Sequence, residues 1–117
     1  MPNHELLKET NEREPVRAVL VAVSSGNDDH TDVLLDELDR LLDTAGGVVF
    51  ARVVQTKRSP DPRTYIGSGK VQELAELCHA NQIGLTIFDD ELTPSQIRNL
   101  EGDMGGDIRV IDRSMLI

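Results

Sequence analysis

Hydrophobic residues recur along this chain with two alternating periods, which predict strands and helices in turn. Residues 16–23 form an almost unbroken β-branched and aliphatic run, a composition typical of a strand buried on both faces of a parallel sheet. Shorter apolar runs follow at 48–54, 85–88 and 108–111. The pattern therefore predicts four strands.

The segment between the first two strands has the period of an amphipathic helix, which we expect over residues 30–45. Asp29 or Thr31 is suited to cap its start, and Gly46 with Gly47 is suited to end it. The apolar stripe that we expect to face the sheet consists of Leu34, Leu38, Leu41, Leu42 and Ala45.

Two further helices are predicted in the second half of the chain. One runs to about Asn81 and carries apolar residues at i, i+3, i+4 and i+7. The other begins with Thr93 as N-cap, Pro94 at its first position and Gln96 closing a capping box, and it ends at Gly105. Their inner stripes consist of Val71, Leu74, Ala75 and Cys78 in the first helix and Ile97, Leu100 and Met104 in the second.

Strands and helices alternate, so the helices serve as crossovers between parallel strands. Right-handed crossovers then give an α/β fold, a four-stranded parallel sheet with helices on both faces in three α/β/α layers. This domain is expected to cover residues 16–117, after a polar and charged segment, residues 1–15, that we expect to be flexible. The apolar end at residues 113–117 has no stop signal, and we expect the domain to be cut from a longer protein.

Composition narrows the classes of function. The net charge of −9 argues against a general nucleic-acid binder, and no DNA partner is expected. No apolar run approaches the roughly 18–20 residues that span a bilayer, and the N-terminus lacks the apolar stretch of a secretory signal. The single cysteine, Cys78, suits a reducing compartment. We therefore expect a cytoplasmic protein without a membrane partner.

Positive charge is concentrated in the long connection from Gln55 to Lys70, which we call the basic loop. It contains one acidic residue, Asp61, and has a local net charge of +3, which leaves −12 for the rest of the chain. A loop of this length in a compact domain is more often functional than accidental, and its two prolines lower the entropy cost of holding it against a partner. We predict that it contacts RNA phosphate, through Lys57, Arg58, Arg63, Tyr65, Gly67, Ser68, Gly69 and Lys70.

Each part of this prediction has an alternative, and on charge alone a merely solvated loop is the more common explanation. Arg58 and Arg63 can bind phosphate oxygens through their guanidinium forks. Tyr65 either stacks on an unpaired base or packs the loop onto the body. The turn from Gly67 to Lys70 offers backbone N–H groups to an anion at a helix start. Lys70 opposes the helix dipole there, so it either has an anionic partner or extends into solvent.

Other chemistries are less well supported. A Walker A loop needs glycine six residues before its lysine and Ser or Thr after it, whereas Thr64 and Val71 occupy those positions and supply no Mg²⁺ ligand. The carboxylates at 89–91 follow a strand, where they could hold Mg²⁺ or accept a phosphoryl group, but we favour an interaction with the dipole of the next helix. The histidines are scattered and Cys78 belongs to a helix face, so no metal site is predicted. No serine has a His–acid partner in the sequence, and no catalytic residue is assigned.

Several short strings in the chain stand out together. They are Arg52, Val53 and Gln55; Asp61 and Pro62; Thr64 to Val71; Glu73 and Leu74; Phe88 to Leu92; Pro94 to Gln96; Arg98 to Leu100; and Val110 to Arg113. These strings resemble the N-terminal domain of the HflX family of ribosome-associated GTPases. The resemblance covers about residues 16–117, and the string from Tyr65 to Lys70 is its most specific part.

The resemblance implies a four-stranded parallel α/β domain that is followed by a helical linker and a G domain. It also implies binding to the large ribosomal subunit, with this domain reaching ribosomal RNA near the peptidyl-transferase region, and a role in splitting or rescuing stalled ribosomes. GTP and Mg²⁺ would bind the G domain of the same polypeptide, so we expect this chain itself to be no enzyme and to hold no cofactor. Two alternatives stay open: an ATP- or GTP-binding domain that uses the turn from Gly67 to Lys70, or a structural module that positions the G domain.

Overall fold

The computed structural model describes residues 14–26 and 30–116. Four strands form one parallel sheet in the spatial order β2-β1-β3-β4. Their bounds are β1 (Val16–Ser24), β2 (Gly47–Thr56), β3 (Leu85–Phe88) and β4 (Arg109–Asp112). The expected flexible segment, residues 1–15, lies almost wholly outside the described residues.

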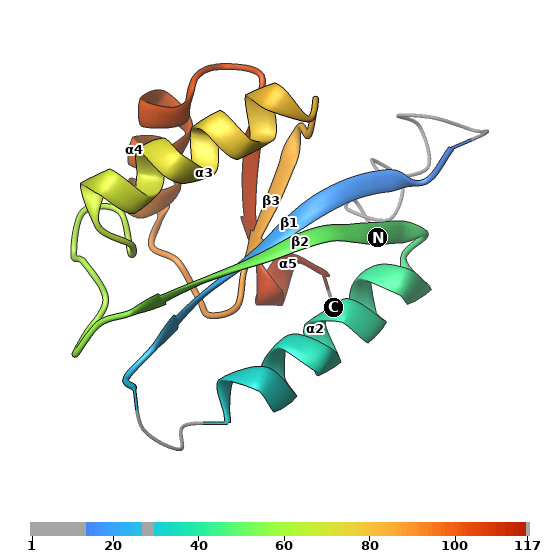
Figure 1. The fold of residues 1–117 in the computed structure, drawn as a ribbon, viewed down its shortest axis with the longest axis horizontal. Helices are drawn as coiled ribbons and strands as arrows, with labels where there is room; N and C mark the ends of the chain where they lie inside the picture. The colour runs from blue at the N-terminus through green and yellow to red at the C-terminus, as the bar shows by residue number, and fades with distance from the viewer. Residues whose placement is uncertain (1–13, 27–29, 117) are drawn as a thin grey trace.

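Helices cover both faces of this sheet (Figure 1). One face carries α2 (Thr31–Thr44) and α5 (Arg113–Leu116), and the other carries α3 (Ser68–Ala80) and α4 (Pro94–Met104). The predicted three-layer α/β fold is confirmed.

β1 lies in the middle of the sheet, and its burial explains the unbroken apolar run of its sequence. Side chains of a strand point to alternate faces. Val19 and Val21 therefore enter the core beneath α3 and α4, whereas Ala18, Leu20 and Ala22 enter the core beneath α2. The prediction of a strand buried on both faces is confirmed.

α2 packs on the sheet with most of its predicted stripe, since Leu38 and Leu42 are buried and Leu41 and Ala45 pack against the same core. Leu35, Leu38 and Leu42 are buried, whereas Leu34 is 40% exposed. Leu34 and Leu35 both fit an amphipathic pattern with the later leucines, and packing on Ala18 and its neighbours selects Leu35. The prediction that Leu34 faces the sheet was therefore wrong.

The ends of α2 also differ from the prediction. Thr31 is the first helical residue rather than the cap, and His30 takes the cap position in a left-handed conformation, with no side-chain cap bond among the described residues. Asp29 lies outside the described residues. At the other end Gly46 has φ of 96°, which glycine adopts without strain, and Gly47 already belongs to β2.

The start of α4 was predicted correctly, because its signals are local. Thr93 accepts a hydrogen bond from the Gln96 backbone, and the Gln96 side chain accepts one from the Thr93 backbone, which completes the capping box. Pro94 occupies the first turn. By contrast, α5 was not predicted, because four residues are too few to show a helical period. No helix within the described ranges is long and apolar enough to cross a membrane.

Candidate functional site

The carboxyl ends of β1 and β3 meet at the point where the chain changes direction across the sheet. From β1 the chain crosses to β2 on one side, and it later returns to add β3 and β4 on the other side. Ligands of open parallel sheets bind at such switch points. Here the basic loop follows β2, and three carboxylates follow β3 at the same edge.

The basic loop is folded into a defined shape by its own backbone. Lys57 donates its N–H to the carbonyl of Ser24, which continues the pairing of β1 with β2. Asp61 and Tyr65 then exchange two backbone hydrogen bonds of 2.9 and 2.8 Å. The Asp61 carboxylate accepts the N–H groups of Arg63 and Thr64, and these bonds lower the pKa of Asp61.

Helix α4 holds this loop from outside. Gln96 donates from its side chain to the carbonyl of Asp61, and Asn99 donates to the carbonyl of Arg63. The Arg63 guanidinium forms a two-pronged contact with Asp103, with distances of 2.5 and 3.1 Å. The loop is therefore bonded to α4 at three points.

Tyr65 packs the loop onto the body, as one of its two predicted roles requires. Its side chain is 5% exposed and its ring meets Phe88 edge-to-face at 5.8 Å. The hydroxyl donates to Asp90 at 3.0 Å, and burial together with this carboxylate raises the pKa of Tyr65. The ring is thus covered in this structure rather than presented for stacking, although φ of 67° at Tyr65 shows that the backbone is strained to place it.

The four cations of the loop fall into two groups. Arg63 and Lys70 have carboxylate partners, Asp103 and Glu73, the second at 3.1 Å. Lys70 therefore pairs within its own helix, and the external anion that one alternative required stays a prediction. Lys57 and Arg58 form no ion pair with any of the described residues, and the Arg58 side chain is exposed.

The turn from Gly67 to Lys70 opens α3 as predicted. Gly67 is the N-cap, and its N–H donates to the Gln55 side chain at 2.8 Å. No side chain of the described residues caps the helix. Gly69 is open to solvent, where an added Cβ would meet no atom within 4 Å. The first turn is therefore a backbone surface that remains available to an anion.

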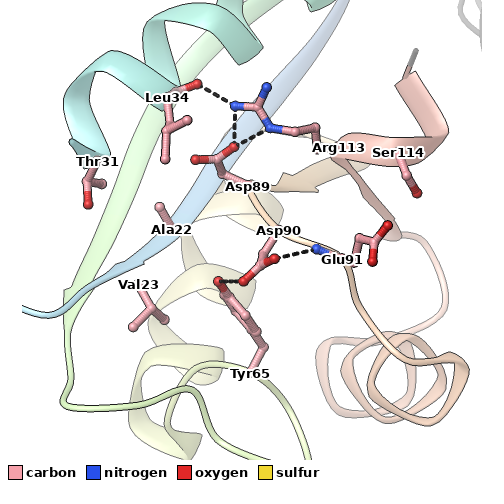
Figure 2. Close-up of a pocket in the computed structure, with 10 residues that line it drawn as sticks. All are labelled: Ala22, Val23, Thr31, Leu34, Tyr65, Asp89, Asp90, Glu91, Arg113 and Ser114. Atoms are coloured by element: carbon pink, nitrogen blue, oxygen red, sulfur yellow. Dashed lines mark hydrogen bonds and ion pairs between the residues drawn. The ribbon is translucent and has the colours of Figure 1, made fainter. Parts of the chain in front are cut away.

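An acidic cavity lies beside the loop, at the ends of β1 and β3 (Figure 2). Its volume is about 410 Å³. Figure 2 shows Tyr65 on one side of the cavity and Arg113 on the other, with the carboxylates between them. The lining residues are Ala22, Val23, Thr31, Leu34, Tyr65, Asp89, Asp90, Glu91, Arg113 and Ser114.

The carboxylates of this cavity have partners that the sequence did not reveal. Asp89, whose side chain is 2% exposed, pairs with Arg113, and the same guanidinium donates to the carbonyl of Leu34. Burial raises the pKa of Asp89, and Arg113 opposes that shift. Asp90 accepts from Tyr65. Two of the three acids that were predicted to face the dipole of the next helix, Asp89 and Asp90, thus have side-chain partners from α5 and the loop.

Metal ligands do not gather in the parts of the chain that the structure describes. No group of three or more His, Cys, Asp or Glu side chains there could hold a metal ion. Cys78 is buried on the inner face of α3, and its burial raises the thiol pKa to about 11. A buried thiol with that pKa is a packing residue rather than a nucleophile.

The sequence of this chain matches known proteins over most of its length. The profile of the family described as GTP-binding GTPase N-terminal matches residues 32–117. The GTPase HflX of Lacrimispora saccharolytica is 41% identical over 111 residues, which are 95% of this chain and 25% of that protein. The GTPase HflX of Escherichia coli is 35% identical over 101 residues, 86% of this chain and 23% of that protein. The chain thus spans about a quarter of the length of these relatives.

Solved structures agree on the fold. A GTP-binding protein from the archaeon Sulfolobus solfataricus in complex with GDP matches with a TM-score of 0.55, over 86% of this chain and 28% of that chain. A variant of the protein SsGBP matches with a TM-score of 0.66, over 86% of this chain and 30% of that chain. Both are 20% identical in sequence, so they support the fold alone. With the family profile and the HflX relatives, the expected resemblance is confirmed, and the chain belongs to the GTP-binding GTPase N-terminal family.

Proposed function

We propose that this chain is the domain through which an HflX-type GTPase contacts the RNA of the large ribosomal subunit. The observation that carries the proposal is the concentration of positive charge on one ordered loop of an otherwise acidic chain. Phosphate contacts supply most of the affinity of proteins for RNA and need only correctly placed cations. The acidic remainder confines such contacts to the loop, which gives the domain one orientation on the RNA.

The structure suggests a different role for each loop residue. Arg58 and Lys57 form no ion pair within the described residues and would contact phosphate directly. Lys70 lies at the uncapped start of α3, where it and the N–H groups of Ser68 and Gly69 would share one phosphate. Tyr65 would hold the loop in shape instead of stacking on a base.

In the longer protein, we propose a division of labour between this domain and a G domain. The relatives are called GTPases, and one solved relative by fold is a GDP complex. GTP and Mg²⁺ would bind the G domain, whose nucleotide cycle would drive the splitting or rescue of stalled ribosomes in the cytoplasm. This chain would supply binding and orientation rather than catalysis.

A pair of charge reversals tests the proposal. We expect Arg58→Glu with Lys70→Glu to lower affinity for large ribosomal subunits about tenfold or more. The slope of the logarithm of the binding constant against the logarithm of the salt concentration should also fall, by the amount that corresponds to the loss of about one to two phosphate contacts. Glutamate at position 70 suits the helix dipole, so the fold should persist, which circular dichroism would check. Co-sedimentation at several salt concentrations measures the binding.

The matched control reverses two exposed cations that lie away from the loop, Arg40 on α2 and Arg109 at the amino end of β4. Its change in net charge is the same, so a general electrostatic effect would weaken both variants equally. Equal binding of the loop variant and the wild type would refute the proposal and favour a structural module that positions the G domain.

A second candidate function is nucleotide binding at the turn from Gly67 to Lys70. The uncapped first turn of α3 favours it, but the Gly67 N–H is already bound by Gln55. Calorimetry of the chain with ATP and with GTP tests this function, and no heat at millimolar nucleotide would exclude it.

A further inference from the structure

The contact between Arg63 and Asp103 links the basic loop to the last turn of α4. It is bidentate, at 2.5 and 3.1 Å, and it joins residues 40 positions apart. Both side chains remain accessible, with 59% of Arg63 and 36% of Asp103 exposed. A ligand can therefore reach the guanidinium without unfolding anything.

Asp103 occupies a position that helix stability alone disfavours. It lies one residue before the end of α4, and the last turn of that helix contains no basic residue. A carboxylate at a helix C-terminus opposes the dipole. The Arg63 guanidinium compensates for this and lowers the pKa of Asp103. The acid is thus explained by its partner in the loop rather than by its own helix.

A carboxylate that holds a guanidinium in this way imitates a phosphate. Both groups present two oxygens to the same pair of N–H donors. The backbone around Arg63 is fixed independently, because Asn99 holds its carbonyl and Asp61 accepts its N–H. Release of the side chain from Asp103 would therefore leave the loop in place.

We propose that Asp103 is a specificity-determining residue that occupies Arg63 until a correctly placed RNA phosphate displaces it. This inference rests on the proposed function of the loop. Arg63 then contributes little to binding of arbitrary RNA, because each such contact must first break an ion pair. Arg63 leaves Asp103 and binds phosphate only when the RNA presents a phosphate beside α4 while it also contacts Arg58 and Lys70.

The test compares two RNA partners, large ribosomal subunits and unstructured polyuridylate. We expect Asp103→Asn to raise affinity for polyuridylate about fivefold and to steepen its salt dependence by about 0.7 in slope, the value for one added phosphate contact on a single strand. Its selectivity for the ribosomal subunit over polyuridylate should fall accordingly. Asp103→Glu, which restores the carboxylate, should return both quantities towards the wild-type values.

Two controls separate this role from a general effect of charge. Asp107→Asn makes the same charge change at an exposed position beyond α4, and it should leave the salt slope unchanged. In the double variant with Arg63→Gln, the gain from Asp103→Asn should disappear, because no guanidinium is left to release. A merely structural Asp103 would instead give a lower melting temperature and weaker binding.

The outcomes also distinguish this inference from the proposed function. If Asp103→Asn behaves like Asp107→Asn while the Arg58 and Lys70 reversals still weaken ribosome binding, the loop binds RNA but Asp103 does not control its selectivity. An equal gain with and without Arg63 would also overturn the inference. If neither set of variants alters ribosome binding, both the inference and the proposed function are wrong.

Discussion

The acidic cavity and the basic loop lie side by side at one edge of the sheet, yet they use charge in opposite ways. In the cavity Asp89 is 2% exposed and is matched by Arg113. In the loop the cations lie at the surface, and two of them form no ion pair with any described residue. Removing one member of a buried pair leaves an uncompensated charge, whereas exposed pairs contribute little to stability. The buried pair in the cavity therefore supports the fold, whereas the unpaired cations of the loop, Lys57 and Arg58, are available to a ligand.

The largest expected effect comes from breaking the cavity's pair. Arg113→Met should lower the free energy of unfolding by about 3 kcal/mol at pH 7, because Asp89 is left buried without a countercharge. Urea denaturation measures this, with Arg109→Met as an exposed control.

The same variant should show a distinctive pH dependence. Burial already raises the pKa of Asp89, and the loss of Arg113 removes the main influence that lowers it. A carboxyl with a higher pKa in the folded state than in the unfolded state takes up a proton on folding, so its protonation favours the fold. The deficit should therefore narrow as the pH falls from 7 to 5. A deficit that stays constant would contradict the assignment.

A smaller loss of stability is expected from a substitution at Tyr65, where the basic loop contacts the acidic cavity. Tyr65→Phe removes the hydroxyl that donates to Asp90 and keeps the ring against Phe88. We expect a loss of about 1 kcal/mol in unfolding free energy, with unchanged RNA affinity. Weaker RNA binding without any loss of stability would show that Tyr65 acts on the ligand and not through the fold.

Within the loop, we expect Asp61 to contribute to the free energy of unfolding through the two backbone hydrogen bonds that its carboxylate accepts. Asp61→Asn keeps one acceptor oxygen and should cost less than about 1 kcal/mol at pH 7. The N–H groups of Arg63 and Thr64 lower the pKa of Asp61, so its stabilisation is present above pH 4 and is lost as the pH falls through the folded-state value. Wild type and variant should converge in urea denaturation as the pH falls below the folded-state pKa of Asp61, and a gap that widened on acidification would contradict this role.

The smallest effect should come from the unpaired cations. Lys57→Gln with Arg58→Gln should change the free energy of unfolding by no more than about 0.5 kcal/mol, since neither side chain forms an ion pair within the described residues. A larger change in thermal melting would mean that these cations support the fold, and the contrast between loop and cavity would fail.

Local signals made much of the fold predictable. The β-branched run of β1 and the capping box of α4 each act within a few residues, and the structure confirms both. The choice between Leu34 and Leu35 as the core residue of α2 was not predictable, because both fit the helical period and only packing on the sheet separates them.

For the candidate site, the sequence revealed the charges but not their partners. The local concentration of positive charge along the chain was enough to find the four cations, Lys57, Arg58, Arg63 and Lys70. Asp103 and Arg113 could not, because each lies many residues from its partner and is brought there by the crossovers of the fold. The covered ring of Tyr65 likewise depends on Phe88 and Asp90, which join it only through tertiary structure.

The place of β2 at the edge of the sheet has a consequence for solubility. Within the described ranges this ten-residue strand pairs with β1 alone, and Val48, Phe50 and Val54 on it are exposed. An open edge of this kind is a template for self-association. Mutual repulsion of copies that each carry a net charge of −9 opposes it. We therefore expect the chain to precipitate most readily near its isoelectric point of about 4.6 and in high salt, where that repulsion is lost or screened.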